Sequence, residues 1–231
     1  MEILQQIPVE INIEALLASV RLKPASREAQ EIQHVIDTIR PEINPKAVYQ
    51  VAYIHAKHAQ AVDIEGIRFT SHVLRVNLDQ AERVFPFIAT CGIEVEELSQ
   101  QYHDVLYQYV LDALKERILR RAVIYLQEHI RATYFPGQLS MMNPGSLQDW
   151  PLKEQKPLFS LFGDVKSAIG VELTESFLMV PVKSVSGIIF PTEVTFENCQ
   201  LCPRTDCPGR RAPYDEGLLK AKYANTEKTG V

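Results

Sequence analysis

Three cysteines toward the C-terminal end of the chain have the residue type and spacing to hold a metal ion. Cys199, Cys202 and Cys207 form a Cys-x2-Cys-x4-Cys pattern, and Pro203 and Pro208 directly follow two of them. The Cys-x2-Cys turn places two thiolates on one side of a tight loop, and the third returns to the same place five residues later. The pattern predicts a thiolate-ligated metal site. Iron–sulfur and zinc both remain open, because both favour tetrahedral thiolate ligation.

A fourth ligand would complete the coordination of this site. Cys91 is the only other cysteine of the chain and is therefore a candidate, together with the six histidines. None of the histidines follows a spacing such as His-Glu-x-x-His, which disfavours a catalytic zinc hydrolase. The alternative to metal binding is a redox disulfide within the cluster.

Composition excludes several other classes of function. The formal net charge of −5 gives no basic stripe for nucleic acid. No run approaches the roughly 18 uncharged apolar residues of a membrane helix, and the N-terminus lacks the basic and apolar regions of a signal peptide. We therefore expect a cytoplasmic protein without a membrane partner. In the cytoplasm thiols stay reduced, which favours metal binding or redox chemistry over structural disulfides.

The elements that must position the cysteines begin with helices in the N-terminal part of the chain. Apolar spacing predicts helices over residues 11–21 and 26–39, the second capped by Ser26. Alternation over residues 61–69 predicts a hairpin that turns at Gly66, and residues 83–90 form an apolar strand. Residues 93–135 contain no glycine or proline and have helical periodicity, but one straight helix would span about 60 Å, so we expect a break near Asp112.

The later part of the chain is predicted to contain a loop, two strands and the cysteines. Residues 138–152 are rich in turn formers, while residues 171–182 and 184–190 read as two strands. Helical blocks and short strands alternate irregularly, which favours the α+β class with an antiparallel sheet flanked by helices. We divide the chain into an N-terminal helical segment (residues 1–45), an α+β core (46–195) and a cysteine-rich metal-binding segment with a tail (196–231).

The stretch from Glu172 to Phe190 carries a family resemblance. It contains Leu-Thr-Glu-Ser-Phe at residues 173–177, a proline at 181 and Ser-Val-Ser at 184–186. Together with Asp-Trp-Pro at 149–151 and the Thr-x-Gly turn that begins at Thr90, this pattern resembles the reactivation, or activation, domain of cobalamin-dependent methionine synthase. The resemblance covers roughly residues 45–190.

The resemblance implies a C-shaped α+β domain that binds S-adenosylmethionine and docks over a corrinoid cofactor. In that family, the domain helps to re-methylate cobalamin after oxidation to the inactive Co(II) state, while an electron donor supplies the reduction to Co(I). Carried over by matching motif, the cofactor-binding candidates of this chain are Asn143, Gly145, Glu175, Ser184 and Ser186.

The chain departs from the family where the family binds its methyl donor. The family motif Arg-x-x-x-Gly-Tyr corresponds here to the loop from Ser140 to Leu147, which keeps Gly145 but lacks the arginine and the tyrosine. Arg120 stands where the family carries an acidic residue. Losing a cation for the ligand carboxylate and reversing a charge near its sulfonium both weaken binding. The sequence therefore leaves S-adenosylmethionine binding in doubt.

Three functions remain after these observations. The first is an accessory protein for reductive reactivation of a corrinoid methyltransferase, with a cysteine-ligated metal centre that supplies or relays the electron. The second is a non-catalytic module with structural zinc that binds a corrinoid protein. The third is an S-adenosylmethionine-binding partner in cobalamin re-methylation. A corrinoid protein or cobalamin-dependent methyltransferase is the expected partner, and a homo-oligomer stays open.

Overall fold

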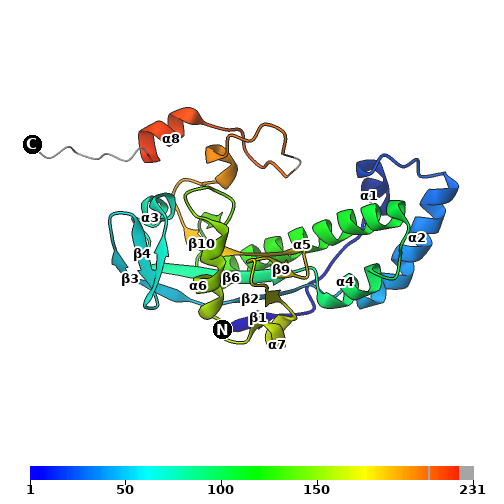
Figure 1. Cartoon of the computed structure of the whole chain (residues 1–231), viewed down its shortest axis with the longest axis horizontal. Coiled ribbons are helices and arrows are strands. Elements are labelled where there is room, and N and C mark those ends of the chain that lie inside the picture. Colours follow the sequence, from blue (N-terminus) through cyan, green and yellow to red (C-terminus); the bar gives the residue numbers. More distant parts are fainter. Residues whose placement is uncertain (208, 224–231) are drawn as a thin grey trace, which may run out of the picture. The chain divides into compact units, whose positions relative to one another are not determined.

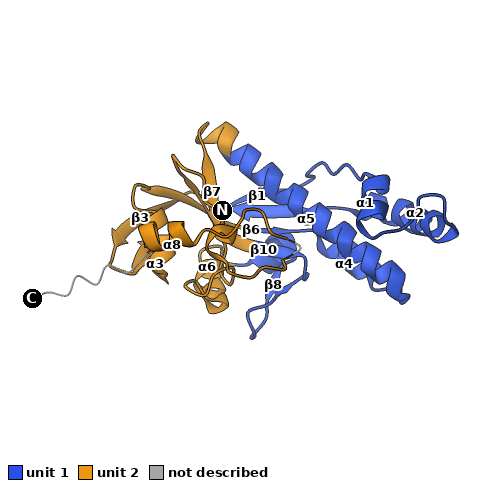
Figure 2. Ribbon diagram, turned by 90° about the horizontal axis from the view of Figure 1, so that it is seen from above, with its two compact units in different colours: residues 1–49, 88–130, 164–185 blue, residues 50–87, 131–163, 186–231 orange. Residues whose placement is uncertain are grey.

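The computed structural model describes residues 1–207 and 209–223 (Figure 1). The chain divides into two compact units, each assembled from three stretches of sequence (Figure 2). Unit 1 comprises residues 1–49, 88–130 and 164–185, and unit 2 comprises residues 50–87, 131–163 and those from 186 onward. The boundary falls within strands β6 (Arg83–Thr90) and β10 (Ser184–Pro191).

Unit 1 is mainly helical, with two short pairs of antiparallel strands. β1 pairs with β2, and β8 pairs with β9. Its elements are β1 (Glu2–Leu4), α1 (Ile13–Ser19), α2 (Arg27–Ile39), the 3-10 turn η1 (Arg40–Glu42), β2 (Lys46–Tyr49), α4 (Ile93–Ser99), α5 (Val105–Thr133, whose last residues belong to unit 2), α7 (Val165–Ile169), β8 (Glu172–Leu173) and β9 (Met179–Val180).

Side chains on one face of each N-terminal helix form the core of unit 1. The predicted cap of α2 is confirmed, because the Ser26 hydroxyl accepts a hydrogen bond from the Ala29 N–H at 3.2 Å. The buried residues of α2 recur at helical spacing and contact apolar residues of α1, α4 and α5. Fully or almost fully buried members of this cluster are Leu16, Leu17, Ile32, Ile36, Ile39, Val95, Val110, Leu114 and Ile118.

The break in the long helical stretch lies earlier than the sequence predicted. α4 ends at Ser99 and α5 begins at Val105, so the prediction of a break near Asp112 is wrong. Asp104 starts the second helix, since its carboxylate accepts hydrogen bonds from the backbone N–H groups of Leu106 at 2.8 Å and Tyr107 at 3.3 Å. An aspartate cap, without glycine or proline, is sufficient to begin a new helix here.

Unit 2 contains most of the antiparallel sheet. Its strand order is β6-β3-β4-β5, and β10 pairs with β6 and β7. The predicted hairpin is confirmed, because Ile64 pairs with Ile67 across a turn in which Gly66 has a φ of 77°. The remaining elements of unit 2 are β3 (Ala52–Lys57), β4 (Ala61–Ile64), β5 (Ile67–Thr70), α3 (His72–Asn77), β7 (Leu139–Met142), η2 (Leu152–Glu154), α6 (Gln155–Ser160), η3 (Asn198–Leu201) and α8 (Glu216–Tyr223).

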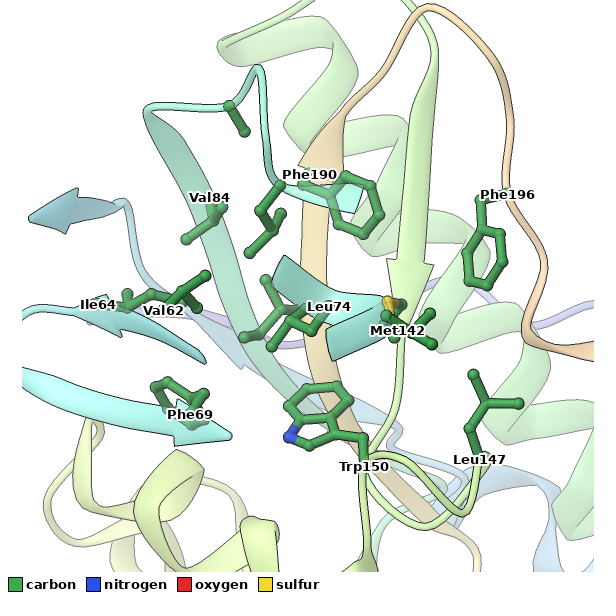
Figure 3. Close-up of a cluster of buried hydrophobic side chains, with 14 of the residues drawn as sticks. Val62, Ile64, Phe69, Leu74, Val84, Met142, Leu147, Trp150, Phe190 and Phe196 are labelled. Atoms are coloured by element: carbon green, nitrogen blue, oxygen red, sulfur yellow. The ribbon is translucent and has the colours of Figure 1, made fainter. Parts of the chain in front are cut away.

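The core of unit 2 combines sheet residues with residues from the C-terminal part of the chain. Figure 3 shows Phe69, Met142, Trp150 and Phe196 among the side chains of this cluster, which also includes Tyr223. Trp150 is fully buried and lies edge-on to Phe69, with ring centroids 6.4 Å apart. The C-terminal segment therefore packs into the same core as the sheet.

The α+β class with an antiparallel sheet is confirmed. Two local predictions are wrong. Residues 138–152 begin with strand β7 rather than a loop, and residues 171–182 form the β8–β9 hairpin rather than one strand. Residue 208 and residues 224–231 of the predicted cysteine-rich segment and tail lie outside the described residues. Within the described chain, no helix has both the length and the apolar character to cross a bilayer.

Candidate functional site

The three C-terminal cysteines lie in a segment of the chain that begins directly after Phe196, a residue of the unit 2 core. We call residues 199–207 and 209–212 the cysteine loop. It starts in the turn η3, where Glu197 and Gln200 form a reciprocal capping box and the Cys202 N–H donates to the Cys199 carbonyl at 3.3 Å. Cys199, Cys202 and Cys207 are each half-buried, and none of them forms a disulfide bond within the described part of the chain. The first two cysteines are thus held in one turn, as the Cys-x2-Cys spacing predicted.

Arg210 connects the backbone of all three cysteines. Its backbone N–H donates to the Cys207 carbonyl at 3.1 Å. Its guanidinium donates to the Cys199 carbonyl and to the Cys202 carbonyl, each at 3.1 Å, and to the Ala212 carbonyl at 3.0 Å. A further bond reaches the Arg204 carbonyl. The guanidinium of Arg210 therefore binds several backbone carbonyls of the loop, a feature that the cysteine spacing does not reveal.

The Cys199 sulfur is approached by backbone donors. The Arg211 N–H lies 3.4 Å from Cys199 Sγ, and the Arg211 side chain forms an ion pair with Glu197 at 3.0 Å. Burial raises the pKa of the Cys199 thiol, but the N–H groups of Arg211 and Ala212 and the charge of Arg211 outweigh this effect and lower the pKa. The environment of Cys199 therefore favours a thiolate.

Cys91, the candidate fourth ligand, has very different surroundings. It lies in the core of unit 1 and is fully buried. Burial raises the pKa of its thiol to about 12, because a thiolate loses its hydration there. Across residues 1–207 and 209–223, no three His, Cys, Asp or Glu side chains are gathered closely enough to hold a metal ion. Metal ligation by the four cysteines stays a prediction.

Two of the predicted cofactor-binding residues lie in a buried polar cluster of unit 2. The Asn143 amide donates to the Ser186 carbonyl at 2.9 Å, and the Asn198 amide donates to Asn143 Oδ1 at 3.3 Å. The Ser186 hydroxyl and the side-chain amide oxygen of Asn198 (Oδ1) are buried without a hydrogen-bond partner among the described residues. Because Asn198 directly precedes Cys199, this cluster joins the predicted cofactor-binding loop to the cysteine loop.

Gly145 and its neighbours close a tight turn beside this cluster. The Gly145 N–H donates to the Trp150 carbonyl at 2.7 Å, and its φ of 84° lies in the left-handed region that favours glycine. Asp149 holds the first turn of helix α3, whose N-cap is Ser71, because its carboxylate accepts from the Val73 N–H at 3.0 Å and also from the Ser71 hydroxyl. The Asp-Trp-Pro motif therefore has a structural role in unit 2.

The other two predicted cofactor-binding residues lie in unit 1. Glu175 is exposed in the turn between β8 and β9, which Thr174 closes by accepting from the Leu178 N–H at 3.0 Å and donating to the Leu178 carbonyl at 3.0 Å. Ser184 is half-buried and donates to the Thr90 hydroxyl at 2.9 Å. Only Glu175, of the five candidates, presents its polar group on an exposed turn.

An exposed apolar row follows this turn and was missed at the sequence level. Leu178, Val180 and Val182 alternate along the chain and are exposed by 58%, 43% and 72%. The next residue, Lys183, pairs with Asp112 at 3.0 Å and Glu116 at 3.6 Å. Large apolar side chains exposed in a row mark interaction surfaces more often than scattered ones do. Alternation at residues 178, 180 and 182 was the available signal.

Comparison with known proteins connects this architecture to a family. Residues 146–197 match the family model of the vitamin B12-dependent methionine synthase activation domain. Over this segment the chain is similar to the activation domain family. The match ends two residues before Cys199, so the cysteine loop lies outside it.

A solved structure extends the likeness in fold to most of the chain. The reactivation domain of MetH, bound to AdoHcy, matches with a TM-score of 0.57 and 19% sequence identity, covering 82% of this chain and 78% of that chain. At this level of identity the match shows the fold. The predicted resemblance and the predicted fold type are both confirmed.

Proposed function

We propose that this chain is a cytoplasmic accessory protein for the reductive reactivation of a corrinoid methyltransferase system. The observation that carries the proposal is the segment at residues 146–197, which matches the activation domain family and contains the hairpin and the apolar row of unit 1. The chain's fold is that of a reactivation domain. A corrinoid protein or a cobalamin-dependent methyltransferase is the partner.

The apolar row is the partner-binding surface in this proposal. Leu178, Val180 and Val182 supply exposed apolar area, and the neighbouring Lys183, Asp112 and Glu116 supply fixed charges around it. An apolar centre beside paired charges is the usual composition of a protein–protein interface. The row would contact the protein that carries the corrinoid.

The chemistry supported begins with an inactive Co(II) corrinoid on the partner. One electron from an external low-potential reductant gives Co(I). Co(I) then attacks the methyl carbon of a sulfonium donor, so that a Co–C bond forms, a C–S bond breaks and a neutral thioether leaves. The AdoHcy in the related MetH structure is the thioether of such a donor. This chain lacks the arginine and the tyrosine of the family's Arg-x-x-x-Gly-Tyr motif, so donor binding is weaker in this proposal than in the family.

The second part of the proposal is a metal centre at Cys199, Cys202 and Cys207 that supplies or relays this electron. Arg210 holds the backbone of all three cysteines, which supports a shared site. The core position of Cys91 argues for a ligand set without it. An iron–sulfur centre would serve electron transfer, whereas zinc would not.

Anaerobic spectroscopy tests reactivation directly. The cobalamin-binding and methyl-transfer part of a methionine synthase, oxidised to Co(II), is mixed with titanium(III) citrate and S-adenosylmethionine, with and without this chain. We expect the chain to bind this probe and to accelerate the appearance of the methyl-Co(III) spectrum. Absence of binding and of any acceleration would refute the proposal.

Matched surface variants test the role of the apolar row. The double variant Leu178→Asp, Val182→Asp is expected to bind the corrinoid-carrying probe about tenfold more weakly or worse, because it places charge in an apolar contact. Val194→Asp is the control, since Val194 is 74% exposed and lies in unit 2, outside the row. Equal losses in both variants would contradict the assignment of this surface.

A zinc-bearing binding module is the second candidate function. It is favoured by the burial of Leu201, within the cysteine loop, and of Tyr223, which follows the loop, in the core of unit 2. Metal analysis with an optical spectrum of oxygen-free protein separates the two. Iron with visible charge-transfer absorption supports electron transfer, and one zinc per chain without colour supports the module.

A further inference from the structure

Unit 1 contains a pocket that the proposed function does not use. The pocket has a volume of about 370 Å³ and lies between residues 8–12 and one face of helix α5. This volume falls within the range of about 300–1,000 Å³ that small-molecule sites occupy. The predicted cofactor-binding loop, residues 140–147, belongs to unit 2. The pocket is therefore a separate feature of the chain.

The pocket has an apolar floor. Leu114 and Ile118 lie one helical turn apart on α5, line the pocket and are almost fully buried. Val9 and Ile11 line it from residues 8–12, where each is half-buried. These four side chains offer the apolar body of a small ligand a surface that is shielded from water.

Two arginines of the same helix line the pocket beside this floor. The Arg117 guanidinium donates to the Ala15 carbonyl at 2.9 Å, and it forms no ion pair with any acidic side chain that the structure describes. Arg121 donates through Nε to the Pro8 carbonyl at 3.3 Å and pairs with Glu128 at 3.1 Å. Because a guanidinium has five N–H groups, both arginines keep donors for an anion.

The wall opposite α5 is held in place by the protein itself. Arg121 fixes the Pro8 carbonyl, and Arg117 fixes the Ala15 carbonyl in α1. Between these points the Asn12 side chain accepts from the Ala15 N–H at 2.8 Å and caps α1. A pocket whose wall is already ordered costs a ligand less entropy on binding.

We propose that this pocket binds a small carboxylate with an apolar body, such as a short-chain fatty acid. The Arg117 guanidinium binds the carboxylate, since its planar donors match two carboxylate oxygens, and the chain of the ligand lies over Leu114 and Ile118. Glu10 also lines the pocket and has no hydrogen bond or ion pair within the described part of the chain. Its negative charge opposes the bound carboxylate and limits the affinity. The proposal does not depend on the corrinoid function.

Nuclear magnetic resonance of the full chain with hexanoate tests the pocket. We expect hexanoate to shift the amide signals of residues 9–12 with a dissociation constant of about 1 mM. Acetate has the charge without the apolar body, and hexanol has the apolar body without the charge, so each should bind about tenfold more weakly or worse. No shift at about 10 mM hexanoate overturns the proposal. Equal binding of acetate overturns the role of the floor, and equal binding of hexanol overturns the role of the arginines.

A matched pair of variants tests Arg117. Arg117→Gln and Arg120→Gln remove the same charge from the same helix, but Arg120 does not line the pocket and pairs with Glu116 at 3.7 Å. We expect Arg117→Gln to bind hexanoate about tenfold more weakly, the loss of one charge-assisted hydrogen bond, and Arg120→Gln to bind it normally. Equal affinities in the two variants overturn the assignment of Arg117.

Glu10→Gln gives a test that does not depend on any bond of the fold. Because Glu10 has no partner among the described residues, its substitution should leave the stability of unit 1 unchanged. We expect the variant to bind hexanoate about threefold more tightly at low ionic strength, with the difference shrinking as salt is added. Weaker binding by Glu10→Gln overturns the proposed carboxylate site, because it shows that the Glu10 carboxylate attracts the ligand.

Discussion

Lys115 offers a sharp test of how burial sets the energy of an ion pair in this protein. Its ammonium lies 2.9 Å from Glu96 Oε2 and 3.0 Å from the Ser99 hydroxyl in unit 1. Only 11% of the Lys115 side chain and 13% of the Glu96 side chain are exposed. Replacing Lys115 with Met leaves a buried carboxylate and a buried hydroxyl without their shared donor. Removal of one partner from such a pair costs about 3–5 kcal/mol.

The control is an ion pair of similar length in a different environment. Arg27 and Glu31 pair at 2.8 Å on helix α2, but their side chains are 87% and 44% exposed. Solvent screens that pair, so Arg27→Met should leave the free energy of unfolding essentially unchanged. Two pairs that differ by 0.1 Å in length should thus differ severalfold in energy because of burial alone.

Urea denaturation followed by circular dichroism measures both effects. The double variant Lys115→Met, Glu96→Leu should lose less stability than Lys115→Met alone, because it removes the unpaired carboxylate as well. If Lys115→Met costs no more than Arg27→Met, or if the double variant is the least stable of all, then desolvation does not govern this site and the reasoning fails.

Three further outcomes are expected. Gly187→Ala should destabilise unit 2 by about 1–3 kcal/mol in urea denaturation, since a Cβ would lie 2.4 Å from the Met142 carbonyl oxygen. Burial raises the pKa of the Cys91 thiol from 9.0 to about 12. The stability that the neutral thiol contributes is therefore complete below pH 9 and is lost as the pH rises toward 12. Cys91→Ala should flatten that decline in the measured free energy of unfolding. Tyr223→Phe should speed hydrogen exchange in α8 and cost about 1 kcal/mol, because the bond to Asn77 is removed.

Local signals in the sequence predicted the elements that depend on local forces. The Ser26 cap and the Gly66 turn involve residues three or fewer positions apart, so composition and spacing are sufficient to place them. The break between α4 and α5 was misplaced because hydrophobic periodicity continues across it. Asp104, followed by a helical pattern, was the signal that could have placed it.

The candidate site was only partly accessible from the sequence. The Cys-x2-Cys spacing predicted that Cys199 and Cys202 lie in one turn. It could not show that Arg210 binds the carbonyls of the loop, because side-chain hydrogen bonds across several residues have no periodic signature in the sequence. Asn143 was identified as a cofactor contact from its motif, and this stays a prediction. The hydrogen bonds of its amide with Ser186 and Asn198 depend on burial that only the folded chain defines.

The packing of Phe196, Leu201 and Tyr223 has a practical consequence for anyone who shortens the chain. Cutting before Phe196 would remove two aromatic rings and a leucine from the core of unit 2 and expose apolar side chains of that cluster to water. The product should be prone to aggregation whatever its metal content. A loss of activity after such a truncation would therefore report on damaged folding, and single cysteine replacements are the cleaner way to ask what the sulfurs do.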